Sequence, residues 1–144
     1  MNDGKMYDRT ETEWARLEAA AWDFLVSRAR KPHPITTYTE LNAVLAHRTG
    51  QPPWNFDLQA DRTAMGELLG RLTDRSFAET KNRPGGSLMI SALCMYLDQN
   101  DVGQGFYGKA AELRFIPTEH LRKDAKDAFW IKQLNGVVQW AASR

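Results

Sequence analysis

The residues of this chain that could carry nucleophilic or metal chemistry are few and lie far apart. There is one cysteine, Cys94, and the three histidines, His33, His47 and His120, fall in unrelated segments. A nucleophilic cysteine needs exposure and a neighbouring base that lowers its pKa, whereas Cys94 stands inside an apolar run and is expected to be a buried, unreactive thiol. One cysteine with scattered histidines also lacks the ligand spacing of a zinc site. The sequence therefore predicts no catalytic residue, no metal site and no cofactor.

A glycine-spaced segment over 103–108, Gly-Gln-Gly-Phe-Tyr-Gly, is a candidate site for a small ligand. It follows an apolar run and precedes a helical pattern, so its backbone N–H groups could bind an anion. Its spacing matches neither the phosphate-binding loop of nucleotide hydrolases nor the dinucleotide-binding fingerprint. The interpretation that we favour is a tight turn in which Gly103 and Gly105 adopt positive φ angles. The residues that a ligand could contact around this turn are Tyr38, Ser91, Asp98, Gly103 and Gly105.

Basic residues gather over two consecutive segments, a pattern that is typical of DNA-binding surfaces. Three arginines lie off the leucine stripe of a predicted helix, and two further cations follow in the glycine-containing arm 80–86. Acidic residues are interleaved with them, and the net charge is only +1, so any attraction to nucleic acid must come from a local patch. The candidate DNA-binding residues are Arg62, Thr63, Arg71, Arg75, Lys81 and Arg83.

The elements that must position these residues are mainly helical. Capping boxes, in which Thr10 is followed by Glu13 and Thr37 by Glu40, predict helices that begin at the two threonines. A third helix is expected to start near position 57 or 61, a short one to cover 105–113 and a last one to cover 118–142. In the third helix, two glycines four residues apart are expected to allow close contact with another helix.

One convincing strand is predicted over Leu88–Leu97. Both of its alternating faces are apolar, so it should be covered on both sides. Its candidate pairing partners are Ile35–Thr36 and Phe115–Ile116. The apolar stripe of the last helix, from Phe129 to Ala141, predicts that this helix is integral to the fold or to a homodimer.

Length and composition limit the number of domains and the kinds of segment that the chain can contain. Its 144 residues suffice for one domain, and we predict a flexible tail over 1–9 and a single domain over 10–144. No stretch is long and apolar enough to span a bilayer, and the N-terminus has no apolar signal core. These features predict a cytoplasmic protein with no membrane partner.

The order of the predicted elements resembles a winged helix-turn-helix module. More narrowly, it is similar to the DNA-binding domain of alkylguanine alkyltransferases and their non-catalytic alkyltransferase-like relatives. Thr37–Leu41 is similar to the family's Thr-Tyr-Gly-x-Leu/Val helix start, and Arg62–Gly66 to the Arg-x-Val-Gly segment that opens its recognition helix. Gly103–Phe106 is similar to the Gly-Gly-Phe turn that follows its active-site strand.

The resemblance departs from the family at the chemical centre. The family's Pro-Cys-His-Arg acceptor segment falls near Met89–Ala92, where there is no cysteine, histidine or arginine, and Cys94 is out of register. The resemblance therefore implies DNA binding without alkyl transfer.

Together these patterns predict a mainly helical α+β fold with a winged-helix-like centre, flanked by an N-terminal helix and a long C-terminal helix. The favoured function is non-catalytic binding of duplex DNA, of a regulatory kind. One alternative is a protein-interaction or inhibitor module that binds a protein partner. A second alternative is a small-ligand binder or enzyme that works around the turn 103–108.

Overall fold

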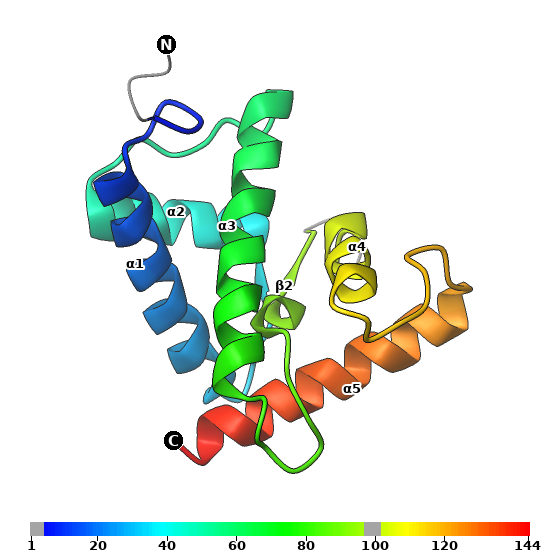
Figure 1. Cartoon of the computed structure of the whole chain (residues 1–144). Coiled ribbons are helices and arrows are strands. Elements are labelled where there is room, and N and C mark those ends of the chain that lie inside the picture. Colours follow the sequence, from blue (N-terminus) through cyan, green and yellow to red (C-terminus); the bar gives the residue numbers. More distant parts are fainter. Residues whose placement is uncertain (1–4, 97–101) are drawn as a thin grey trace.

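The computed structural model describes residues 5–96 and 102–144, and helices make up most of them (Figure 1). The mainly helical α+β class is confirmed, because the strands in the described part of the chain form only one small sheet. No helix in those residues is both long and apolar enough to cross a bilayer. The elements are α1 Glu11–Ala29, β1 Thr36–Thr37, α2 Tyr38–Thr49, α3 Gln59–Glu79, a 3-10 helix Ile90–Leu93, β2 Cys94–Met95, α4 Gln104–Glu112 and α5 Lys123–Ala142.

The first two helices begin at their predicted capping residues. Thr10 and Glu13 bond each other's backbone N–H groups, which completes the capping box of α1. At α2, the Thr37 hydroxyl accepts from the N–H of Glu40, but the Glu40 carboxylate turns away from the helix end. It accepts instead from the Thr36 hydroxyl at 2.6 Å and from an arginine of α1. Glu40 therefore fastens β1 to α1 instead of completing a second box.

The predicted strand over Leu88–Leu97 is wrong for most of its length. Leu97 lies outside the described residues. Over 88–96 the chain is extended up to Met89, turns through the 3-10 helix and forms a strand only at Cys94–Met95. This strand pairs in parallel with β1, Thr36 opposite Cys94, so the first of the two candidate pairing segments is confirmed in part.

Side chains of two helices satisfy the backbone that a neighbouring strand would otherwise have paired. The N–H of Leu88 donates to Thr80 Oγ1 at 2.8 Å, and the N–H of Ile90 donates to Ser76 Oγ at 3.0 Å. The N–H of Met89 donates to Oε1 of Gln133 in α5 at 2.8 Å. Because these partners are fixed on helices, the segment can be buried without a sheet around it.

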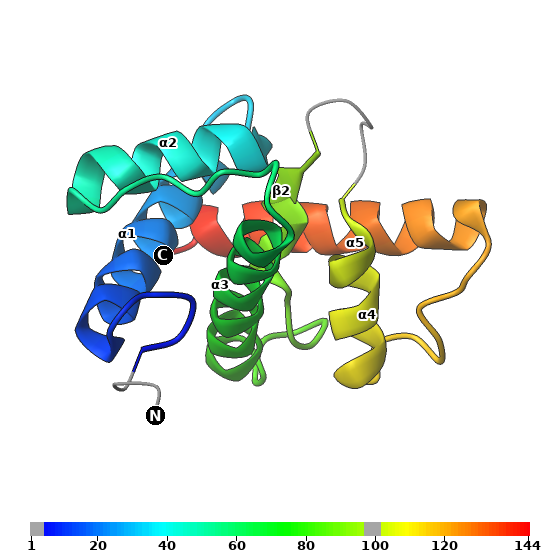
Figure 2. The ribbon, with the colours of Figure 1, turned by 90° about the horizontal axis from the view of Figure 1, so that it is seen from above.

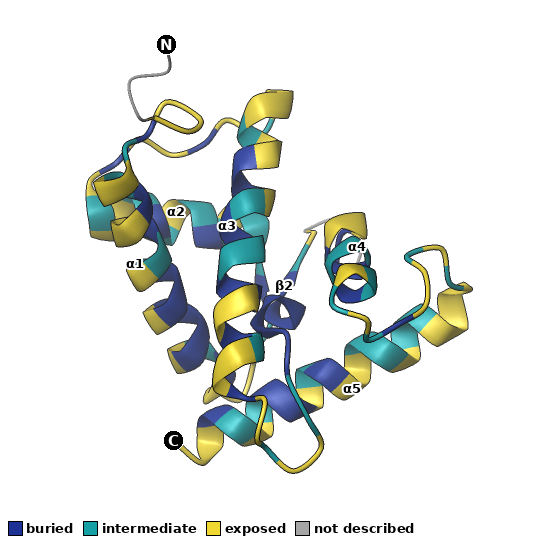
Figure 3. Cartoon of the chain, in the orientation of Figure 1, coloured by how far each residue is buried: buried dark blue, intermediate teal, exposed yellow. Residues whose placement is uncertain are grey.

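The segment 88–94 is covered on both sides, as the sequence predicts (Figure 3). Leu88, Ile90 and Leu93 belong to a principal core with α1, α2 and α3, whereas Met89 and Ala92 belong to a second cluster around α4. The 3-10 turn explains why the two sets do not follow the strict alternation of a strand.

The C-terminal helix α5 is integral to the fold. It runs beneath α3 and α4 in Figure 1 and contributes to both clusters. Trp140 packs edge-on against Trp22 of α1, with ring centroids 5.8 Å apart, and Phe129 packs against Phe106 of α4 at 5.8 Å. The apolar stripe is thus used within one copy of the chain, and a homodimer is not needed to explain it.

The N-terminal segment differs from the expected flexible tail in the part that the structure describes. Arg9 is buried and donates to Gln51 Oε1 at 2.6 Å and to the carbonyl of Pro52 at 2.7 Å. Its guanidinium also lies 4.7 Å from the ring centroid of Trp54. These contacts tie the start of the chain to the loop after α2, a role that a polar segment does not signal in the sequence.

Candidate functional site

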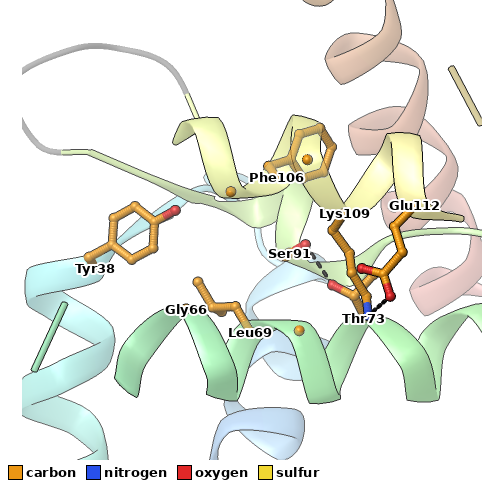
Figure 4. A pocket seen from close by; sticks show the side chains of 11 residues that line it. Tyr38, Gly66, Leu69, Thr73, Ser91, Phe106, Lys109 and Glu112 are labelled. Carbon is orange, nitrogen blue, oxygen red and sulfur yellow. Dashed lines mark hydrogen bonds and ion pairs between the residues drawn. The ribbon is translucent and has the colours of Figure 1, made fainter. Parts of the chain in front are cut away.

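A groove with a cavity volume of about 210 Å³ lies between α3 and α4 (Figure 4). Figure 2 shows these two helices next to each other, with α5 running behind both. Four segments that are distant in the sequence line it: the start of α2, one face of α3, the 3-10 helix and α4. The lining residues include Tyr38, Gly66, Gly70, Thr73, Ser91, Gly105, Phe106, Lys109 and Glu112.

The floor of the groove is a pair of hydroxyl groups. Thr73 Oγ1 and Ser91 Oγ lie 2.7 Å apart, and only 6% of Ser91 and 1% of Thr73 are exposed. Each hydroxyl carries one hydrogen, and either oxygen can be the donor of the bond between them. This bond therefore uses one of the two hydrogens. The second hydrogen has no acceptor in the described part of the chain. The floor therefore offers one hydrogen-bond donor, together with oxygen lone pairs, to a group that enters the groove.

The walls of the groove are aromatic rings and bare backbone. Tyr38 stands at one end and Phe106 on the α4 side (Figure 4). A Cβ atom added to Gly66 or Gly70 would meet no atom within 4 Å. The two glycines therefore leave the groove open on the α3 side. The expectation that they allow close helix contact is wrong for this reason.

The charges at the far end of the groove are paired with one another. Nζ of Lys109 lies 2.8 Å from Asp74 of α3 and 3.6 Å from Glu112 of α4. Burial of the Lys109 ammonium opposes its charge, but the hydrogen bond and charge of Asp74, with those of Glu112, outweigh burial and raise its pKa. Lys109 is thus a cross-link between α3 and α4 whose charge is already compensated.

The glycine turn does not have the predicted backbone conformation. Gly103 caps α4 with a φ of −71°, and the positive-φ glycines among the described residues are Gly50, Gly85 and Gly86. The reason for glycine at 103 is close approach, because an added Cβ would lie 2.5 Å from Cε2 of Tyr96.

Of the residues predicted around this turn, the structure brings Tyr38, Ser91 and Gly105 to one groove. Gly103 lies against Tyr96 and is not part of the lining. Asp98 lies outside the described residues.

Two of the predicted DNA-binding arginines are engaged in contacts within the protein. Arg71 lies 3.0 Å from Glu67 and 3.4 Å from Glu18, and its guanidinium stacks 4.6 Å from the Trp14 ring. Arg75 stacks 3.9 Å from the ring of Trp22 in the same way. Both side chains cover tryptophans of α1, so they face away from the groove side of α3.

The other predicted DNA-binding residues lie at the two ends of α3. Arg62 is exposed near its start, where it donates to the Phe56 carbonyl at 2.6 Å, and the neighbouring Thr63 is also exposed. Lys81 and Arg83 follow its C-terminal end, about 30 Å away along a helix of this length. The structure therefore does not gather the six predicted residues into one patch.

Cys94 is fully buried, as predicted. Burial raises the pKa of its thiol to about 12, and the charge of Glu40 acts in the same direction. Within residues 5–96 and 102–144, no three histidine, cysteine, aspartate or glutamate side chains gather as metal ligands would.

Sequence reasoning missed the polar residues that hold the groove floor in place. Thr73 and Ser76 are buried on the inward face of α3, and Thr80 is buried at its C-cap. Their spacing of three and four residues puts them on the leucine stripe of that helix, and this is the signal that could have identified them. Comparison of the chain with protein-family models, with curated proteins and with solved structures gave no match.

Proposed function

We propose that this chain is a non-catalytic DNA-binding module with a winged-helix-like centre, and that its α3–α4 groove receives an unstacked base. The main observation in support of the proposal is that segments distant in the sequence meet at the groove. Each segment on which the family resemblance depends contributes to the groove: Tyr38 from the helix start, Gly66 from the recognition-helix segment, and Gly105 with Phe106 from the glycine turn. Ser91, which also lines the groove, comes from the segment near which the family's acceptor motif falls.

The chemistry of the groove suits a planar polar group. Proteins that extract a base from a duplex hold it by stacking on aromatic side chains and by hydrogen bonds to its edge. Tyr38 and Phe106 supply the rings, and the Thr73–Ser91 pair supplies one donor and several lone pairs. Stacking on one aromatic ring contributes about 1–3 kcal/mol per base.

The same groove supports binding without group transfer. Ser91 belongs to the segment near which the acceptor motif of the similar family falls, but its polar partner is another hydroxyl, that of Thr73. No histidine lines the groove in the described part of the chain, and the nearest lining carboxylate, Glu112, is paired with Lys109. Ser91 therefore has no base to activate it.

Binding should depend only moderately on salt. With Arg71 and Arg75 held against tryptophans, the predicted cations left for phosphates are Arg62, Lys81 and Arg83. Three phosphate contacts correspond to a slope of about −3 in a plot of log affinity against log salt, and this is an upper limit on its steepness.

The experiment is a fluorescence anisotropy titration with a fully paired duplex and with a duplex that carries one unpaired base. We expect the second duplex to bind more tightly. Gly70→Leu should fill the groove and weaken that binding by about tenfold, the loss of one stacked base. The matched control is Ala78→Leu, on an exposed position of the same helix outside the groove. Equal binding of both duplexes by the wild type and by Gly70→Leu contradicts the role of the groove, and no binding at micromolar protein contradicts the function.

A second candidate is a binder of a free small molecule with similar chemistry. The observation in its favour is that the cation lining the groove, Lys109, is already neutralised by two carboxylates. Saturable binding of a nucleoside that is abolished by Gly70→Leu, without binding of either duplex, would favour this candidate.

A protein partner is less well supported by the structure. The large exposed apolar side chains that such a partner would use lie in separate segments: Met6, Tyr7, Leu58, Tyr96 and Ile131.

A further inference from the structure

A second hollow, which we call the cleft, lies between the turn 80–87 and α5 and has a volume of about 260 Å³. It shares no lining residue with the groove. Two cations, Arg83 and Lys132, line it together with the amides Gln133, Asn135 and Gln139. None of its described lining residues is acidic, so its positive charge is not compensated locally.

Gln133 forms the inner wall of the cleft, and its orientation is fixed. Its side chain is only 5% exposed, and its Oε1 accepts from the N–H of Met89 at 2.8 Å. Because a backbone N–H can only donate, the oxygen must face Met89 and the amide nitrogen must be the other atom. That nitrogen has no acceptor in the described part of the chain. Among the described residues no buried side-chain nitrogen lacks a partner, so this amide nitrogen is open to the cleft, where the oxygen of a ligand can accept from it.

The cations lie at the same opening. Nη1 of Arg83 donates to the carbonyl of Gly86 at 3.1 Å, which orients the guanidinium across the turn. Its Nη2 would lie 3.5 Å from a Cβ atom at Gly136, so this edge faces α5. Lys132 is exposed and has no ion pair among the described residues. The two groups that are oriented by hydrogen bonds and face the cleft, the Arg83 guanidinium and the Gln133 amide nitrogen, are both donors.

We propose that the cleft binds an oxyanion of the phosphate type. Guanidinium, ammonium and carboxamide donors approach the cleft from two elements, and a phosphate group presents enough oxygens to accept from all of them. This proposal does not depend on the groove, although it shares Arg83 with the cations proposed to contact DNA phosphates. The phosphate can belong to a nucleic-acid backbone or to a free phosphate ester, and the experiment below distinguishes the two.

The test is an NMR titration of the 15N-labelled full chain with inorganic phosphate at constant ionic strength. We expect saturable shifts of the Gln133 side-chain NH₂ signals and of the Gly136 amide. Lys132→Gln should weaken binding by about tenfold, as expected for the loss of one charge-assisted contact. The matched control, Lys123→Gln, removes a lysine of the same helix that is paired with Asp127 at 3.3 Å, and it should leave the affinity unchanged.

Gln133→Glu adds a variant that keeps the acceptor for Met89 and replaces the donors of the amide by a negative charge. It should fold and should lose the response to phosphate. Absence of saturable shifts in the wild type, or equal affinity in all variants, overturns the proposal. If a fully paired duplex shifts the same signals at lower concentration than phosphate, the anion belongs to a nucleic-acid backbone. If phosphate alone shifts them, it belongs to a free ligand.

Discussion

The groove and the cleft are similar in volume, about 210 and 260 Å³, but opposite in chemistry. Each has a lysine from a helix in its wall. Lys109 of the groove is paired with Asp74 and Glu112, whereas the described residues that line the cleft around Lys132 include no acidic one. The groove therefore suits a neutral planar group and the cleft suits an anion. The comparison teaches that a lysine in the sequence indicates a binding charge only after its neighbours in space are known.

The two hollows share one structural support. The segment 88–91 contributes Leu88 to the cleft and Ser91 to the groove, and Ser76 of α3 holds its backbone. The Ser76 hydroxyl accepts from the N–H of Ile90 at 3.0 Å and lies 2.8 Å from the carbonyl oxygen of Leu88. A change at Ser76 should therefore disturb both hollows at once.

The largest effect is expected for Ser76→Ala. It leaves a buried N–H and a buried carbonyl without their partner and should lower the free energy of unfolding by about 2–4 kcal/mol. Urea unfolding measures this loss of stability. Titrations with the duplexes and with phosphate should show weaker binding at both the groove and the cleft. Ser27→Ala on the exposed face of α1 is the control, with no change expected. Wild-type stability in Ser76→Ala would show that the segment does not depend on this hydroxyl.

The elements that local patterns specify were predictable from the sequence. The threonine caps at Thr10 and Thr37 and the burial of Cys94 depend on neighbours within a few residues or on an apolar run. The observed course of the chain over 88–93 was not predictable, and a strand was expected there instead. The backbone N–H groups of 88–90 donate to side chains of Ser76, Thr80 and Gln133 and not to another strand. An apolar run alone cannot show where its backbone hydrogen bonds go.

The candidate sites show the same division between features that local sequence specifies and features that depend on neighbours in space. Tyr38, Ser91 and Gly105 were named from the sequence and do meet in the groove. Arg71 was named for DNA because the sequence does not reveal that Trp14 lies beneath it. Gln133 resembles any polar residue of an amphipathic helix, and only its burial beside Met89 identifies it.

The next effect concerns Cys94, which lies in the principal core behind the groove and does not line the cleft. Its pKa is raised from 9.0 to about 12 by burial, with a contribution from Glu40. Above pH 9 the unfolded thiol loses its proton while the folded thiol keeps it. Stability is therefore complete below pH 9 and falls by about 1.4 kcal/mol per pH unit until the folded pKa is reached.

The measurement compares urea unfolding of the wild type and of Cys94→Ala near pH 8 and near pH 10.5. Between these values the wild type should lose about 2 kcal/mol more than the variant. Near pH 8 the variant should be the less stable by about 1 kcal/mol, because it buries less apolar area. Parallel losses in the two proteins would mean that the thiol is already ionised or exposed in the folded state.

The smallest effects are expected for two glycine-to-alanine substitutions, one beside the groove and one beside the cleft. Gly66 of α3 borders the groove, and an added Cβ would meet no atom within 4 Å. Gly66→Ala should therefore stabilise the protein by up to about 1 kcal/mol, the gain in helix propensity. Gly136 of α5 borders the cleft, and there an added Cβ would lie 2.5 Å from Cδ2 of the buried Leu88.

Gly136→Ala gains the same helix propensity but must displace Leu88 from a packed position. Overpacking a core costs about 1–3 kcal/mol, which outweighs the gain of about 1 kcal/mol, so the net effect should be a small loss of stability. Thermal unfolding of both variants and of the wild type shows directly whether each substitution raises or lowers the stability. Because Leu88 lines the cleft, Gly136→Ala should also weaken phosphate binding, whereas Gly66→Ala should leave it intact. A stabilising Gly136→Ala would mean that α5 can move away from the 88–91 segment, and the cleft would then lack the fixed Gln133 on which the anion site depends.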